Sequence, residues 1–266
     1  MTEVTRGQKI YLAAVCFLAL WVGVFGYFIP TQIDKAIPWL VPPLHARFLG
    51  AMYLSGAAFT IGCLLARAYA EVRVTVRMIA IWTGMLFVVS LFYLSEFDYS
   101  LTQVWVWFGA YLIYPLIALW LMWRDRAPRA AAAVPDLPAW ARGYLLAQGV
   151  IVTALALFLL FVPDIMATVW PWKITRLLAQ LYSAPFLSYG LGSLMLSRQQ
   201  TWLEVRVAVA GTFVFAIAVL IASFIHRELF SIANLATVLW FGGFSVAMVM
   251  LGFLSVRAIQ KGSSAP

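Results

Sequence analysis

The chain has 266 residues, of which 64% are hydrophobic and 11% charged, and its formal net charge is +8. Water-soluble domains carry about 25% charged residues, so this composition excludes an ordinary soluble fold. We expect a protein that is embedded in a lipid bilayer.

Eight apolar stretches are each long enough to cross the hydrocarbon core as a helix, which needs about 20 residues. Lipid offers no partner for backbone polar groups, and the chain lacks the alternating segments of a membrane barrel, so we predict an all-α membrane protein. The predicted spans are residues 10–28, 46–67, 76–96, 103–123, 143–162, 177–197, 206–226 and 235–257.

The second part of the chain repeats the first. When Tyr11 is placed on Tyr144 and the chain is continued without a gap, scarce Trp and Pro residues coincide, and these matches carry most weight because Leu matches are common in an apolar chain. We call this pairing of positions the repeat alignment. An even number of spans in each copy keeps both copies in the same orientation, so the pattern predicts two parallel four-helix tandem repeats. Matching positions include Pro30 and Pro163, Trp39 and Trp172, Glu71 and Glu204, Arg73 and Arg206, Trp107 and Trp240, and Arg124 and Arg257.

This repeat also sets the predicted domain boundaries. Residues 1–123 form the first repeat and residues 143–261 the second, joined by a Pro- and Ala-rich linker at 124–142. Residues 262–266 are expected to form a loose tail. The first apolar stretch resembles a signal peptide, but its match to the fifth predicted span assigns it to the folded protein.

The positive charges lie unevenly about the predicted spans. Thirteen Lys and Arg residues fall on the side of the termini, and five fall on the other side. By the positive-inside rule, both termini are cytoplasmic in a bacterial-type inner membrane. The charge is therefore a topology signal, and we expect no nucleic-acid partner. The five residues on the outer side are Lys35, Arg47, Lys173, Arg176 and Arg227.

No charged residue lies near the middle of a predicted span, which disfavours proton- or sodium-coupled transport and leaves an uncoupled carrier or channel open. His45 and His226 are both expected on the outer side, where they are either solvated or paired axial ligands of a haem. A further set of outer residues forms either a polar ring around an outer vestibule or exposed ion pairs of small energetic value. This set consists of His45 and Arg47 near Glu96 and Asp98, with Lys173, Arg176, Arg227 and Glu228 in the other half.

Two outer loops carry Ile37-Pro38-Trp39 and Trp170-Pro171-Trp172. Pro restricts the backbone and Trp prefers the headgroup region, so these loops predict interfacial elbows. Trp107 and Trp240 recur at matching depth. They are interpreted as an aromatic belt or as walls for a flat apolar ligand such as a quinone, carotenoid or sterol-like lipid.

Small residues line one face of the second predicted span, at Ala51, Ser55, Ala58 and Gly62, and Ala184 and Ser188 repeat the first two in the sixth. Such seams allow close helix packing in lipid, so both spans are expected at the centre of the bundle. The Glu and Arg pairs at 71/73 and 204/206 are predicted in short cytoplasmic loops with structural roles. Cys16 and Cys63 are expected to be small packing residues.

The leading hypothesis is a non-enzymatic protein whose outer-facing cleft between the repeats holds or passes a small apolar or neutral ligand. Two alternatives remain: an accessory subunit of a membrane complex, with a bound pigment or haem, and an intramembrane enzyme using His45, His226, Glu96 or Asp98. Common catalytic and nucleotide motifs are absent, and neither a metal nor a cofactor is assigned. The candidate ligand-binding residues are Trp39, His45, Arg47, Trp107, Trp172, Arg176, His226 and Trp240.

Overall fold

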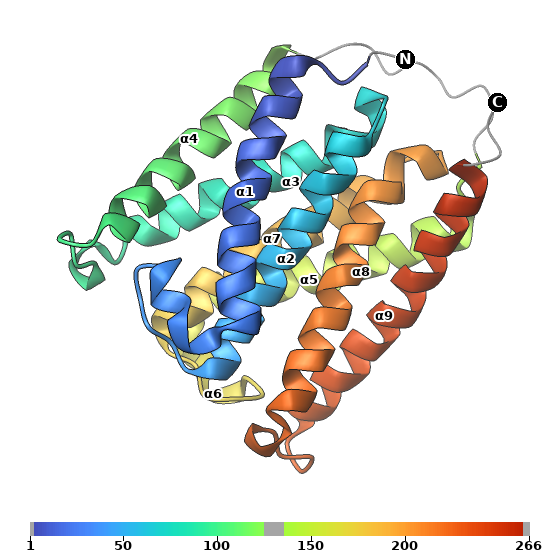
Figure 1. Ribbon diagram of the computed structural model, residues 1–266. Coiled ribbons are helices and arrows are strands. Elements are labelled where there is room, and N and C mark those ends of the chain that lie inside the picture. The colour runs from blue at the N-terminus through green and yellow to red at the C-terminus, as the bar shows by residue number, and fades with distance from the viewer. Residues whose placement is uncertain (1–2, 125–135, 263–266) are drawn as a thin grey trace.

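The computed structural model describes residues 3–124 and 136–262, which fold into a bundle of helices (Figure 1). Most of the predicted linker and residues 263–266 of the predicted tail lie outside these residues. Within them the structure contains no β-strand, only an isolated bridge between Glu3 and Ala68. The elements are α1 (Arg6–Phe28), η1 (Pro30–Lys35), α2 (Pro43–Leu65), α3 (Tyr69–Leu91), η2 (Leu94–Glu96), α4 (Thr102–Arg124), α5 (Ala139–Phe161), α6 (Pro163–Val169), α7 (Arg176–Leu196), α8 (Trp202–Ile225), η3 (Arg227–Leu229) and α9 (Leu235–Gly262).

Seven of these helices are long and apolar enough to cross a membrane: α1, α2, α3, α4, α5, α8 and α9. The protein is therefore an all-helical, multi-pass membrane protein. The helix α7, predicted as a further span, is not among the seven. It carries Gln180, Pro185 and several Ser and Gly residues, and most of its side chains are buried against other helices. A helix that faces protein on most sides needs less apolar surface than one that faces lipid.

Helices α3 and α8 begin earlier than predicted, so Glu71 and Glu204 lie in the first helical turn and the loop assignment is wrong. Each carboxylate accepts hydrogen bonds from backbone N–H groups at the start of its own helix. Glu71 takes those of Arg67 and Ala68, at 3.2 and 3.1 Å. Because of this capping, the helix can begin at charged residues. These residues lower the local hydropathy, so the apolar stretch begins later than the helix. Helix α5 likewise begins at Ala139, inside the predicted linker.

Helices α2, α3, α7 and α8 form the centre of the bundle. Helix α2 packs on α8, α3 packs on α7, and α3 and α8 also meet each other. On the outside, α1 covers α2, α5 covers α7, α4 covers α3 and α9 covers α8. The central position predicted for the small-residue seams is confirmed at Ala51 and Ser55, which are fully buried. Ser55 donates to the Gly211 carbonyl at 2.7 Å, and Ser188 donates to the Met78 carbonyl at 2.8 Å.

The two ends of the bundle differ. Helix α1 begins and α9 ends at the same end, which we call the terminal end (Figure 1). The opposite or distal end holds η1, α6, η2 and η3 together with the segments that join them to the long helices. Both η1 and α6 follow a sharp change of backbone direction, at Ile29 (φ −127°, ψ 56°) and Val162 (φ −128°, ψ 52°). The distal loops thus fold back onto the bundle and position the candidate residues.

Candidate functional site

A cavity of about 260 Å³ lies at the distal end, between α2, α3, the segment 37–42 and the first half of α7. Its lining contains no Asp, Glu, Lys, Arg or His. Tyr53 and Thr175 contribute the only hydroxyl groups, and the remaining side chains are aliphatic residues, prolines and tryptophans. A water molecule needs only about 10–15 Å³ of such space, so the cavity has room for a small organic molecule. A neutral, mainly apolar molecule matches this lining.

Trp39 and Trp107, two of the predicted ligand-binding residues, meet in the wall of this cavity. Their ring centroids lie 5.0 Å apart at an interplanar angle of 77°. The Trp107 indole donates to Ser90 Oγ at 2.8 Å, which fixes the ring. Because Trp107 is only 8% exposed, it faces the bundle and not lipid, so the aromatic-belt interpretation is wrong for this residue.

Trp172 and Trp240 form a second pair with similar geometry, at 4.8 Å and 86°. The Trp240 indole donates to Ser223 Oγ at 3.0 Å. Here the rings are packed among other aromatic side chains. The ring centroid of Phe48 lies 5.3 Å from that of Trp172 and 5.5 Å from that of Trp240. Both tryptophans are buried, so the belt interpretation is also wrong for Trp240, and the Trp172 ring faces the bundle.

The side chains around the two pairs explain why one adjoins a cavity and the other is packed. In the repeat alignment, Ile37 in the cavity wall corresponds to Trp170, and Leu49 corresponds to Tyr182. Leu181 in the cavity wall corresponds in the opposite direction to Phe48. In each comparison the packed cluster has the larger side chain. The ring centroids of Phe48 and Tyr182 lie 4.8 Å apart, close enough to fill the corresponding space.

Buried His45 belongs to the packed cluster. Its Nδ1 hydrogen bonds to the Tyr182 hydroxyl at 2.9 Å, and its ring lies 6.4 Å from Trp172. Leu178, its counterpart in the repeat alignment, lines the cavity. The structure therefore separates His45 from Trp39 and Trp107, although all three were predicted as ligand-binding residues.

The polar ring predicted around an outer vestibule is not assembled as expected. Arg47 Nη1 donates to His226 Nε2 at 2.6 Å, and it does not pair with Glu96 or Asp98. His226 Nδ1 lies 3.6 Å from Glu228. Burial, followed by the nearby Arg47 charge, lowers the pKa of His226 below its ordinary value. Arg47 therefore meets a neutral imidazole and joins α2 to the end of α8.

The other charged candidates lie at the surface. Arg176 makes an exposed ion pair with Asp164, at 3.6 Å. Asp98 accepts hydrogen bonds from the Ser100 backbone and hydroxyl, and these bonds lower the pKa of Asp98. Both contacts are exposed to solvent, which screens them, so neither supports a site.

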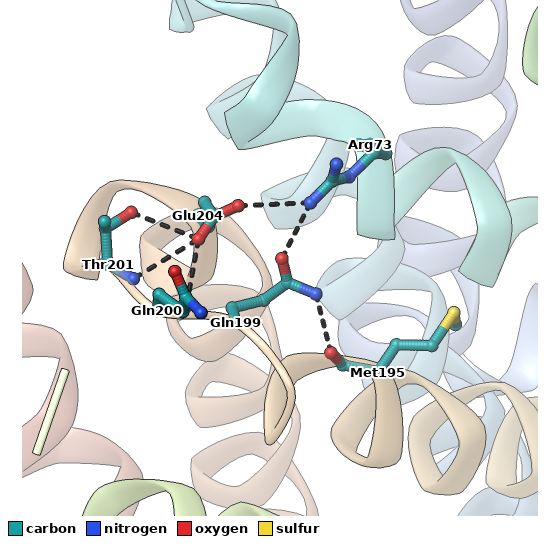
Figure 2. Close-up of polar contacts among 6 residues, drawn as sticks. All are labelled: Arg73, Met195, Gln199, Gln200, Thr201 and Glu204. Carbon is teal, nitrogen blue, oxygen red and sulfur yellow. Dashed lines mark hydrogen bonds and ion pairs between the residues drawn. The ribbon is translucent and has the colours of Figure 1, made fainter. Parts of the chain in front are cut away.

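At the terminal end, two ion pairs cross between α3 and α8. Arg73 contacts Glu204 at 3.1 Å, and Arg206 Nε donates to Glu71 at 2.7 Å. Figure 2 shows Arg73 between Glu204 and the Gln199 side chain, whose oxygen accepts at 2.7 Å. The predicted structural role of these residues thus takes the form of a clamp between two helices that are distant in the sequence. It holds α3 and α8 together at the end opposite the cavity.

Sequence reasoning missed Tyr53, the cavity residue with a buried hydroxyl. Its hydroxyl hydrogen bonds to that of Tyr111 in α4. The signal was present in the repeat alignment, where Tyr53 corresponds to Phe186 and Tyr111 to Phe244. In both comparisons a hydroxyl is present at the first position and absent from the aligned one.

Metal chemistry finds no support in the part of the chain that the structure describes, which contains no group of three or more His, Cys, Asp or Glu side chains placed to hold an ion. Cys16 and Cys63 are buried and free, as expected for packing residues. Comparisons with protein families, curated proteins and solved structures give no significant match to this chain.

Proposed function

We propose that this membrane protein binds a small, neutral and largely apolar ligand in the distal cavity beside Trp39 and Trp107. The observation that carries the proposal is the cavity itself, about 260 Å³ in volume and free of charged lining residues. The two tryptophans supply flat apolar surface, and the ligand gains from leaving water or lipid for a shaped pocket.

We also propose that the chain consists of two parallel four-helix repeats with eight spans, α7 being the additional one. Contacts that recur under the repeat alignment support this arrangement. Each recurring pair joins equivalent groups in the two copies. The recurring pairs are Glu71–Arg206 and Glu204–Arg73, Ser55–Gly211 and Ser188–Met78, Ser90–Trp107 and Ser223–Trp240, and Arg47–His226 and Gln180–Tyr93.

In this arrangement the termini are cytoplasmic in a bacterial-type inner membrane, and the cavity faces the outer side between the two repeats. The excess of Lys and Arg at the terminal end supports this orientation. Each crossed ion pair joins one repeat to the other and keeps the cytoplasmic side closed. The ligand therefore reaches its site from the outer side or from the bilayer.

Two observations favour a binding protein over the alternatives. No carboxylate, amine or imidazole lines the cavity, and such groups are the commonest proton-transfer groups in enzymes. His45 hydrogen bonds to Tyr182 through one ring nitrogen, and His226 accepts a hydrogen bond from Arg47. The two histidines therefore have separate partners and do not form one site. No specific observation favours haem ligation or an accessory-subunit role.

Native mass spectrometry and a visible spectrum of the protein in mild detergent test the proposal. The wild-type protein is expected to retain a small apolar molecule that solvent extraction releases. A variant with Ile37→Trp and Leu49→Tyr introduces an aromatic residue of the kind found at Trp170 and Tyr182 and is expected to lose that molecule. Retention of the same molecule by the folded variant would place it outside the cavity and contradict the proposal.

A further inference from the structure

The hydrogen-bonded side chains of Tyr53 and Tyr111 lie beside two cavities. A second cavity, of about 80 Å³, lies between α1 and α4 and against α2 and α3. Tyr53, Trp82 and Trp107 line both cavities, and Tyr111 lines the second one. The two spaces therefore share a wall at the only pair of hydrogen-bonded phenols among the described residues.

Counting donors shows that this pair has hydrogen-bonding capacity to spare. Two phenols have two O–H donors, and one of these serves the bond between Tyr53 and Tyr111. For the other donor, the described part of the chain provides no further hydrogen-bond acceptor. Both side chains lie within membrane-spanning helices, where an unmade hydrogen bond is costly. A ligand acceptor at this point removes that cost.

The fold does not require these hydroxyl groups. In the repeat alignment, Phe186 replaces Tyr53 and Phe244 replaces Tyr111, and both phenylalanines pack against Phe215. The corresponding helices α7 and α9 thus pack, through Phe215 of α8, without any phenol at these positions. The hydroxyl pair is found beside the two cavities, and the corresponding pair of positions, at Phe186 and Phe244, has no hydroxyl.

We propose that the Tyr53–Tyr111 pair donates a hydrogen bond to the carbonyl group of a lipid-soluble ligand, whose apolar part extends into the two cavities. This inference rests on the proposed function, for which it names the ligand class. The free O–H is a hydrogen-bond donor, so the ligand must supply an acceptor. In an apolar site a neutral acceptor is favoured, and a carbonyl oxygen is the acceptor that a lipid-soluble molecule most readily brings there.

The second cavity also gives such a ligand a path from the bilayer. Its lining includes Val106, which is 49% exposed on the outside of α4, and Leu18 of α1, which is half-buried. Helices α1 and α4 are joined nearer the terminal end, where Tyr11 donates to the Tyr114 carbonyl at 3.0 Å. Between this contact and the distal end, the wall of the cavity includes the exposed side chain of Val106, which faces lipid. A molecule dissolved in the membrane reaches the tyrosines there without crossing water.

A competition experiment in lipid nanodiscs tests the inference. A photoreactive alkyl diazirine labels the cavity, and mass spectrometry of peptides quantifies labelling at Leu49 and Met52. The competitors are 2-undecanone and undecane, which differ chiefly by one carbonyl group. In the wild-type protein the ketone is expected to displace the label at a concentration about threefold to tenfold lower than the alkane, as one hydrogen bond predicts.

The variants Tyr53→Phe, Tyr111→Phe and the double substitution remove the hydroxyls and keep the rings. The double variant is expected to abolish the preference for the ketone while undecane still competes. Tyr27→Phe is the matched control, because the Tyr27 hydroxyl donates to the Ala218 carbonyl at 2.8 Å and lies outside both cavities. This control variant is expected to keep the preference.

The possible outcomes separate the two proposals. Equal competition by ketone and alkane in the wild-type protein, or a preference that survives in the double variant, overturns the role of the tyrosines and leaves the cavity as a binding site. If neither competitor reduces labelling, and Leu49→Tyr leaves the labelling unchanged, the distal cavity does not bind apolar molecules. The proposed function then fails together with this inference.

Discussion

The Trp39–Trp107 and Trp172–Trp240 pairs have nearly the same geometry and opposite surroundings. Each pair is T-shaped, and the inner tryptophan of each donates to a serine, Ser90 or Ser223. One pair lines a cavity and the other lies in a packed aromatic cluster. The difference is due to side-chain volume at a few surrounding positions. Similar Trp–Trp geometry can thus be kept while one pair borders open space and the other is fully packed.

The largest expected effect compares the outer members of the two pairs. Trp172→Ala removes a buried ring from the aromatic cluster and is expected to lower the free energy of unfolding by about 3–5 kcal/mol. Trp39→Ala enlarges an existing cavity at a half-buried residue, so it is expected to cost less than half as much while removing ligand binding. Chemical denaturation in detergent measures both. Equal losses of stability would show that the two sites are packed alike.

The next effect comes from opening the packed cluster. Phe48→Leu gives this position the residue type found at Leu181 and is expected to cost about 1–2 kcal/mol, because the side chain is buried among several other aromatic rings and leaves a gap. The new space is expected to admit the alkyl diazirine near Trp172. Thermal unfolding and peptide labelling check the two consequences. A variant that is destabilised but never labelled would show that the cluster collapses when it loses volume.

Filling the cavity is expected to have a smaller effect on stability. Leu49→Tyr gives the cavity wall the residue type found at Tyr182, and it places a larger ring in space that is already open. We expect the free energy of unfolding to change by less than about 1 kcal/mol, because filling a cavity offsets the cost of accommodating a larger side chain. Ligand labelling is expected to fall to background. A loss of several kcal/mol would mean that the ring does not fit the cavity.

The smallest effect concerns pH and the contacts that join α2 to α8 and α3 to α7. The folded protein lowers the pKa of His226 from its ordinary value of 6.5 through burial and the Arg47 charge, with Glu228 acting in the opposite direction. Above that value the residue is neutral in both the folded and unfolded states. As the pH falls below it, the unfolded state binds the proton first, so stability decreases.

This effect is measured as the difference in melting temperature between about pH 7.5 and pH 5.5. His226→Gln is expected to reduce the difference, because the replacement does not titrate. The matching contact between Tyr93 and Gln180 contains no group that titrates in this range, so Tyr93→Phe serves as the control. An identical pH dependence in the wild-type and His226→Gln proteins would contradict the assignment.

The sequence was sufficient to predict an all-helical membrane protein and to single out Trp39 and Trp107, because hydropathy and scarce residues are visible in one dimension. It was insufficient at Trp172 and Trp240, whose burial depends on Phe48 from a different helix. It also misplaced Glu71 and Arg73, since a charged first turn looks like a loop until its capping contacts are known. The cavity depends on the combined volume of side chains from several helices. The order of residues in the sequence does not show which of these side chains meet.

The crossed ion pairs have a consequence for biosynthesis. Glu71 and Arg73 leave the ribosome well before Glu204 and Arg206, which are their partners in the finished protein. Glu71 is 2% exposed in the folded chain and cannot remain there without a counter-charge, because an unpaired buried charge is costly. Until α8 has been made, Glu71 therefore lacks the counter-charge of Arg206. A chain truncated before α8 leaves Glu71 without the Arg206 guanidinium, and it is expected not to bury this carboxylate.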